Sequence, residues 1–180
     1  MKLAIITGAS KGIGYFLSEQ LVSKGYKVLN ISRTKSNLKE VINYEFDLSN
    51  FDKIPSLVKE IVKDHGSPYL LINNAGIASM NHTLLMKNSK VVDIINLNLL
   101  SPIILTKEIA KFMIKGEGKI LNISSVAVPL LLEGEAVYAA SKSGLEIFSK
   151  IFAKELSNVS VEVTSLGLTP IATDLIKNVP

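Results

Sequence analysis

The chain has 180 residues, of which 47% are hydrophobic, and it contains no cysteine. This composition predicts one packed globular domain and excludes disulfides, thiolate nucleophiles and thiolate metal sites. The net charge of +4 comes from scattered lysines, with Arg33 the only arginine, so we expect no nucleic-acid partner, because such binders usually cluster arginines beside exposed aromatic side chains. No run reaches the roughly 18 apolar residues of a membrane span, and we expect a cytoplasmic protein without a membrane partner.

Short apolar runs alternate along the chain with longer segments of helical period. Strands are predicted over residues 2–6, 27–32, 44–46, 69–73, 119–124 and 161–165, and helices over 13–24, 52–64, 91–115 (with a break allowed at 98–102) and 136–157. The strands are near-continuous runs of Ile, Leu and Val, which is typical of strands covered on both faces. The alternation predicts an α/β fold: a doubly wound parallel sheet in three α/β/α layers, forming a single domain over residues 1–180.

A glycine-rich turn, T-G-A-S-K-G-I-G at residues 7–14, joins the first predicted strand to the first helix. Glycines permit positive φ and let the backbone approach a ligand closely. The helix start adds free N–H groups and the positive end of its dipole. A tight turn in which the glycines serve geometry alone is the alternative. Three glycines at the first strand-to-helix junction favour a bound pyrophosphate, as in Rossmann-type folds.

The spacing of these glycines resembles the T-G-x-x-x-G-x-G motif of the short-chain dehydrogenase/reductase family. Further motifs follow in the family's order: D-L-S at residues 47–49 is similar to the acidic segment beside adenine, residues 73–76 read N-N-A-G, and Asn98 stands where the family's asparagine opens a helix. Ser125, Tyr138 and Lys142 reproduce its S…Y-x-x-x-K arrangement. The resemblance covers nearly the whole chain, and the family members that the chain resembles include NADP-dependent 3-oxoacyl-carrier-protein reductases.

The second predicted strand ends N-I-S-R, without the carboxylate that accepts the ribose 2′-hydroxyl in NAD-preferring sites. A guanidinium holds a 2′-phosphate well, so Arg33, together with Lys11, predicts NADP(H); two solvated surface cations are the alternative. With the resemblance, the predicted cofactor-binding residues are Gly8, Ser10, Lys11, Gly12, Ile13, Gly14, Ser32, Arg33, Asp47, Leu48, Asn74, Ala75, Gly76, Tyr138, Lys142, Ile171 and Thr173.

Four predicted catalytic residues complete the pattern. Tyr138 and Lys142 lie one helical turn apart, where an ammonium favours phenolate and lowers the tyrosine pKa from near 10. Tyr138 is then expected to donate a proton to a carbonyl oxygen as hydride reaches the carbon. The resemblance implies that Ser125 orients the carbonyl, that Lys142 also binds the nicotinamide ribose, and that Asn98 holds a water in a proton relay. Taken singly, each residue has an ordinary explanation as a surface, turn or cap residue, and only the combination with the other motifs favours catalysis.

The chain departs from the family pattern in three places. Leu168 and Thr169 replace the usual Pro-Gly pair before the cofactor-contacting loop. Arg33 and Asp47 stand so close in sequence that the helix after the second strand is predicted to be short or absent. The chain stops at Pro180, where relatives commonly continue, so we expect the usual lid and seventh strand to be lacking and the pocket to be open.

The leading hypothesis is an NADPH-dependent reductase of a small-molecule ketone or aldehyde, with a 3-oxoacyl thioester as one substrate and a sugar or other small ketone as others. The alternative is an NADP(H) sensor without turnover. The apolar segment 127–135 indicates either a partly hydrophobic substrate or a partner subunit. By resemblance, helices at 101–115 and 136–157 predict a homodimer, with a tetramer as the larger option. No metal is expected, and His65 and His82 match no catalytic position.

Overall fold

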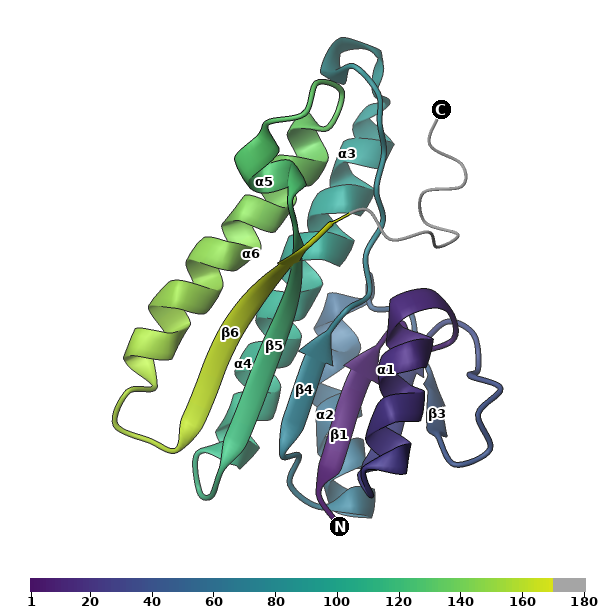
Figure 1. Ribbon diagram of the computed structural model, residues 1–180, viewed down its shortest axis with the longest axis vertical. Helices are drawn as coiled ribbons and strands as arrows, with labels where there is room; N and C mark the ends of the chain where they lie inside the picture. The colour runs from purple at the N-terminus through teal and green to yellow at the C-terminus, as the bar shows by residue number, and fades with distance from the viewer. Residues whose placement is uncertain (170–180) are drawn as a thin grey trace.

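The computed structural model describes residues 1–169. Its core is a six-stranded parallel sheet in the order β3-β2-β1-β4-β5-β6 (Figure 1). The strands are β1 (Leu3–Thr7), β2 (Lys27–Ser32), β3 (Ile42–Glu45), β4 (Leu70–Asn73), β5 (Gly118–Ser125) and β6 (Val161–Leu168). From β1 the chain first adds strands in one direction and then, starting with β4, in the other. This reversal confirms the predicted doubly wound sheet and creates a switch point between the carboxyl ends of β1 and β4, where ligands bind in such folds.

Helices cover both faces of the sheet, as Figure 1 shows. They are α1 (Gly12–Ser23), α2 (Ile54–His65), α3 (Asn88–Ile95), α4 (Ser101–Met113), α5 (Ala127–Leu130) and α6 (Ala136–Glu155), with short 3-10 turns η1 (Phe51–Lys53) and η2 (Thr83–Leu85). One buried cluster joins the sheet to α2, α4 and α6, and a second lies under α1. Successive residues of β1, such as Ile5 and Ile6, point to opposite faces of the sheet and enter different clusters. The strand is apolar throughout because both of its faces are covered. The predicted three-layer α/β/α architecture is confirmed.

A buried polar network ties the centre of the sheet to two helices. The Asn73 side chain on β4 donates from Nδ2 to Thr106 Oγ1 on α4 (2.8 Å) and to Asn122 Oδ1 on β5 (2.7 Å). Asn122 in turn donates to Ser149 Oγ on α6 at 2.8 Å. Buried amides need such partners, and the network holds α4 and α6 in place behind the carboxyl ends of β4 and β5.

The predicted break at residues 98–102 is wrong, because the helix continues through a π-helical turn, η3 (Asn96–Leu100), from α3 into α4. Asn98 therefore does not open a helix but lies inside one, fully buried. Pro102 has no N–H and cannot bond the carbonyl four residues earlier; the wider turn accommodates it, and the Ser101 N–H bonds Asn96 O, five residues back. The stretch Asn88–Met113 is long and apolar enough to cross a membrane by length and composition; its α4 part packs against the sheet through buried side chains such as Leu105 and Ile109.

Two places where the sequence departs from the family pattern lie in the described residues, and only the first has the predicted structure. No helix joins β2 to β3 in the described chain, which confirms the short or absent helix. Strand β6 runs to Leu168, three residues past its predicted end, with Leu168 in register with Ser125. A leucine in place of proline leaves the strand free of the steric limits that end a ladder.

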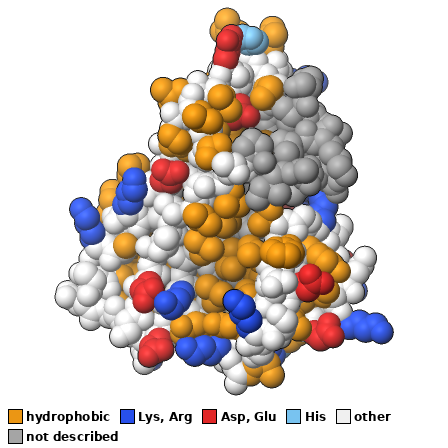
Figure 2. All heavy atoms as spheres, in the orientation of Figure 1, with side chains coloured by type: hydrophobic (Ala, Val, Ile, Leu, Met, Phe, Trp, Pro, Cys, Tyr) orange, Lys and Arg blue, Asp and Glu red, His pale blue; other side chains and the backbone are white. Residues whose placement is uncertain are grey.

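Only part of the α1 side of the sheet is covered by helix in the described residues. Helix α1 packs over β1 and β2, whereas Figure 2 shows apolar side chains gathered over the neighbouring strands. Leu166 on β6 is 47% exposed there, and Leu121 on β5 is partly exposed.

Candidate active site

The glycine turn forms a cradle for an anion at the end of β1. Gly8 and Gly12 have φ of +69° and +59°, in the left-handed region that favours glycine. A Cβ at Gly14 would lie 2.5 Å from the Gly8 carbonyl oxygen, so no side chain fits there. Lys11, the residue before α1, makes no side-chain cap within the described residues, which leaves the first N–H groups of the helix for a ligand. The cradle fits a pyrophosphate.

The N-N-A-G segment after β4 is fastened to this turn. Thr7 Oγ1 accepts from the backbone N–H groups of Asn74 (3.0 Å) and Ala75 (2.9 Å). Asn74 Nδ2 donates to Thr7 O at 3.0 Å and to Gly8 O at 3.3 Å. The two motifs therefore form one rigid unit across the switch point between β1 and β4. Thr7 was not among the predicted site residues, although its place as the threonine of the T-G motif could have indicated it.

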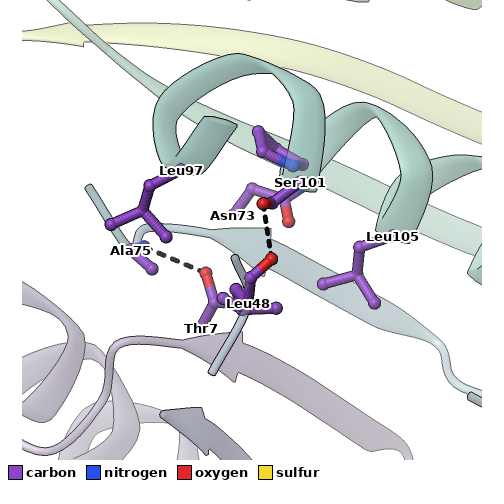
Figure 3. A pocket seen from close by; sticks show the side chains of 8 residues that line it. Thr7, Leu48, Asn73, Ala75, Leu97, Ser101 and Leu105 are labelled. Atoms are coloured by element: carbon purple, nitrogen blue, oxygen red, sulfur yellow. Dashed lines mark hydrogen bonds between the residues drawn. The ribbon is translucent and has the colours of Figure 1, made fainter. Parts of the chain in front are cut away.

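Close beside this unit is a small cavity, shown in Figure 3, lined by Thr7, Leu48, Asn73, Ala75, Leu97, Ser101, Pro102 and Leu105. Ser101 Oγ, from the start of α4, lies 2.6 Å from the Leu48 carbonyl oxygen and 2.7 Å from Asn96 O. A hydroxyl has one hydrogen, so it bridges these two carbonyls and ties the predicted adenine-side loop to the π turn that carries Asn98. Ser101 was missed because its partner Leu48 is 53 positions away in sequence.

Arg33 and Asp47 follow the carboxyl ends of β2 and β3, at the same end of the strands as the glycine turn. Hydrogen bonds from the Ser49 N–H (2.9 Å) and hydroxyl (2.8 Å) to Asp47 Oδ1 lower the pKa of Asp47, and the Arg33 charge lowers it further. The carboxylate is therefore charged at neutral pH and available as an acceptor. Arg33 and Lys11 are both exposed, as two cations that receive a phosphate must be. Ser32, by contrast, already donates its hydroxyl to Thr34 O.

Asn98 is held in one orientation by three hydrogen bonds. Its Oδ1 accepts from the Ile77 N–H at 2.9 Å, while Nδ2 donates to Ile77 O at 2.8 Å and to Ser141 Oγ at 3.2 Å. The side chain thus connects the π turn with the N-N-A-G loop and with α6. Ser141, which the sequence interpretation did not single out, adjoins Lys142 on that helix.

Lys142 projects from α6 into the same buried space. A Cβ at Gly76 would lie 3.1 Å from Asn98 Oδ1 and 3.5 Å from Lys142 Nζ, so these two groups converge on the backbone of Gly76. The ammonium donates to the Ile123 carbonyl oxygen at 2.8 Å, and only 4% of the residue is exposed. Burial lowers the pKa of Lys142 to about 8, because a low-dielectric surrounding disfavours the charged form.

Tyr138 and Ser125 meet at the carboxyl end of β5. The Ser125 side chain is close enough to Tyr138 to lower the pKa of the phenol, and Ser125 Oγ accepts from the Ala127 N–H at 3.1 Å. The expected lowering of the tyrosine pKa by Lys142 is not found. Burial raises the pKa of Tyr138, the nearby Ser125 side chain lowers it, and the charge of Glu135 raises it again. The Lys142 Nζ lies 5.9 Å from the centre of the Tyr138 ring and is tied to Ile123, so desolvation dominates.

The structure thus brings the four predicted catalytic residues to the carboxyl edge of the sheet, beside the glycine cradle. Ser10 and Ile13 lie within the cradle and are partly exposed. Ile171 and Thr173 lie outside the described residues. The histidines are elsewhere: His65 Nδ1 accepts from Lys27 Nζ at 2.9 Å, at the start of β2, and His82 Nε2 lies 3.6 Å from Glu133.

Comparison with known proteins agrees with this arrangement. The short chain dehydrogenase family model matches residues 2–180. The 3-oxoacyl-(acyl-carrier-protein) reductase FabG of Buchnera aphidicola is 37% identical over 176 residues, covering 92% of this chain and 72% of that protein. Among solved structures, 4-hydroxyisoleucine dehydrogenase complexed with NADH has a TM-score of 0.91 at 30% identity, covering 98% and 78% of the two chains. A metagenomic short-chain oxidoreductase in complex with NADP has a TM-score of 0.85 at 29% identity, covering 95% and 82%.

The chain belongs to the short-chain dehydrogenase family. It is an oxidoreductase with a nucleotide-binding Rossmann fold, as the motifs predicted. The comparisons lend no support to the alternative of a cofactor sensor without turnover.

Proposed function

We propose that this oxidoreductase uses NADPH to reduce the carbonyl group of a ketone or aldehyde to an alcohol. The observation that carries the proposal is the proximity of Ser125 and Tyr138 at the carboxyl end of β5, next to the buried ammonium of Lys142 and at the same end of the strands as the glycine cradle. Two hydroxyls that converge at one point bind a carbonyl oxygen, and one of them can protonate it.

The roles of the residues follow from their surroundings. The nicotinamide supplies the hydride when it is bound. Tyr138 donates its hydroxyl proton to the substrate oxygen as the new C–H bond forms, and Ser125 keeps that oxygen in place. Burial raises the pKa of Tyr138, so the hydroxyl carries its proton at neutral pH and is ready for reduction. Lys142, whose ammonium is bonded to the Ile123 carbonyl oxygen, is proposed by resemblance to bind the nicotinamide ribose, and Asn98 holds the π turn and the N-N-A-G loop in place beside it.

The cofactor would be held by the residues already placed at this edge. The glycine cradle with Ser10, Lys11 and Ile13 takes the pyrophosphate side, Asp47 and Leu48 take the adenine, and the N-N-A-G segment supports both. Arg33 supports a preference for the 2′-phosphate, because it is exposed at the end of β2, where an NAD-preferring site has a carboxylate. Ile171 and Thr173 are proposed to contact the nicotinamide carboxamide, by resemblance.

A 3-oxoacyl thioester is the first substrate to test, since a relative at 37% identity is named for that reaction. Leu130, Leu131 and Leu132 are 60%, 83% and 39% exposed in the segment after β5, which suits a substrate with an apolar chain. A sugar or other small ketone remains in the panel. We also propose a cytoplasmic homodimer formed through α4 and α6, where Ile147 and Ile151 are each 53% exposed. Sedimentation that shows a monomer at micromolar concentration would remove the dimer; a tetramer would extend it.

The test of the activity is NADPH consumption with this panel of carbonyl compounds, run on the wild-type protein and on Tyr138→Phe. The reductase proposal expects turnover in the wild type and a loss of about a hundredfold or more in the variant, because the proton donor is gone. NADPH affinity, measured by thermal shift, should remain. Equal turnover by the two proteins would show that Tyr138 is not the proton donor.

A further inference from the structure

The segment between β2 and β3 (residues 33–41) carries Arg33 but has no helix of its own to hold it. A connection without secondary structure leaves backbone groups that need other partners. In this protein two asparagine side chains supply them, Asn30 from β2 and Asn43 from β3.

Asn30 connects the segment to the glycine turn. Its side chain is 1% exposed, and Oδ1 accepts from the Ala9 N–H, inside the turn, at 2.9 Å. Because that bond fixes which end of the amide is the acceptor, Nδ2 faces the other way. It donates to Ser32 Oγ (2.9 Å) and to Thr34 O (3.4 Å). The two partners are the residues immediately before and after Arg33.

Asn43 continues the same chain of contacts. Its Oδ1 accepts from Asn30 Nδ2 at 2.9 Å and from the Ser36 N–H at 2.8 Å. Its Nδ2 donates to Val41 O at 3.2 Å and lies 3.4 Å from Ser36 O. Asn43 thus holds the segment at Ser36 and at Val41, while Asn30 holds the residues beside Arg33 and joins them to the cradle.

We propose that Asn30 and Asn43 are positioning residues that determine cofactor specificity, by fixing the Arg33 backbone at one distance from the glycine turn. The inference rests on the proposed NADPH preference. A guanidinium on a mobile segment must be ordered before it binds a phosphate, and that ordering reduces affinity; a segment already ordered avoids the loss. The amide pair contacts the segment and the turn, not the nicotinamide, so it acts on the 2′-phosphate and leaves the hydride step alone.

The test is a double-mutant cycle on steady-state kinetics with NADPH and NADH, using Asn43→Ala, Arg33→Ala and the combined variant. Asn43→Ala should raise the KM for NADPH about five- to tenfold, the usual size for one preorganised polar contact. The KM for NADH and both kcat values should stay within about twofold. In the Arg33→Ala background the same change should leave the NADPH/NADH ratio unaltered, because the group that it positions is absent.

Asn158→Ala, in the exposed turn after α6, controls for loss of an asparagine as such. Thermal unfolding checks that every variant is folded, and Asn43→Ser replaces Asn43→Ala if the latter is not. The inference is overturned if the substitution at position 43 changes both KM values equally, changes neither, or shifts the ratio equally with and without Arg33. Failure of the underlying NADPH preference would appear separately, as an Arg33→Ala enzyme with an unchanged ratio.

Discussion

Replacement of the buried Lys142 by methionine should abolish turnover and yet remove a source of instability from the fold. Burial lowers the pKa of Lys142 from 10.5 to about 8. The folded protein therefore disfavours the ammonium that it carries at neutral pH, whereas the unfolded chain does not. Catalytic groups kept in surroundings that oppose their charge are a common origin of a trade-off between activity and stability.

The magnitude follows from the size of the shift. A depression of roughly 2.5 pH units corresponds to about 3 kcal/mol of lost folding free energy at about pH 7. Methionine fills a similar volume but leaves the Ile123 carbonyl without the 2.8 Å bond from Nζ, which costs about 1–3 kcal/mol. Lys142→Met should therefore be between unchanged and about 2 kcal/mol more stable than the wild type at about pH 7.

The pH dependence isolates the charge from the lost bond. Because the folded pKa of Lys142 is below the unfolded value of 10.5, the folded state binds fewer protons between about pH 8 and that value. The free energy of unfolding of the wild type gains from this group as pH rises through the window. Lys142→Met has no such gain, so its stability relative to the wild type should fall by about 2 kcal/mol from about pH 7 to about pH 9.5.

The assay is urea unfolding followed by circular dichroism at both pH values. Lys150→Met, an exposed position on the same helix, is the matched control and should differ from the wild type equally at the two values. If the difference between Lys142→Met and the wild type does not change with pH, burial does not penalise this ammonium, and the account of the site given above is wrong.

Two further substitutions test the backbone contacts that support the site. Gly14→Ala should lower the free energy of unfolding by about 1–3 kcal/mol through overpacking, because its Cβ would lie 2.5 Å from the Gly8 carbonyl oxygen. It should also remove the rise in Tm caused by NADPH, and a normal response to NADPH would contradict the proposed cradle. Gly116→Ala, where a Cβ would meet nothing within 4 Å, is the control and should have neither effect. Ser101→Ala should lower the free energy of unfolding by about 1–3 kcal/mol and weaken NADPH binding by freeing the Leu48 loop, as measured by urea unfolding and by titration; an unchanged affinity would show that the loop needs no tie.

Much of the fold could be predicted because its signals are local. Apolar runs of strand length alternate with segments of helical period, and parallel sheets impose right-handed crossovers on such an order. The glycine turn was equally readable, since residues 7–14 must combine positive φ with a close backbone approach, and few sequences satisfy both.

The features that were misread depend on groups far apart in sequence. In the sequence, Asn98 followed by Ser101 and Pro102 is typical of the start of a helix. Only the folded structure shows that Asn98 lies buried inside a π turn and that its side chain bonds Ile77 and Ser141. The pKa of Tyr138 was predicted to fall because its spacing from Lys142 was visible, whereas its burial was not.

The order of the chain and the identity of its polar residues therefore determined the family, the parallel sheet and the edge at which the site lies. Tertiary structure alone decided how those residues are coupled: Lys142 to the Ile123 carbonyl, Ser101 to the Leu48 loop, and Asn30 to both the glycine turn and the Arg33 segment. The reason is physical. Periodicity and spacing are properties of neighbouring residues, but desolvation and hydrogen-bond partnership depend on what the folded chain brings together from distant positions.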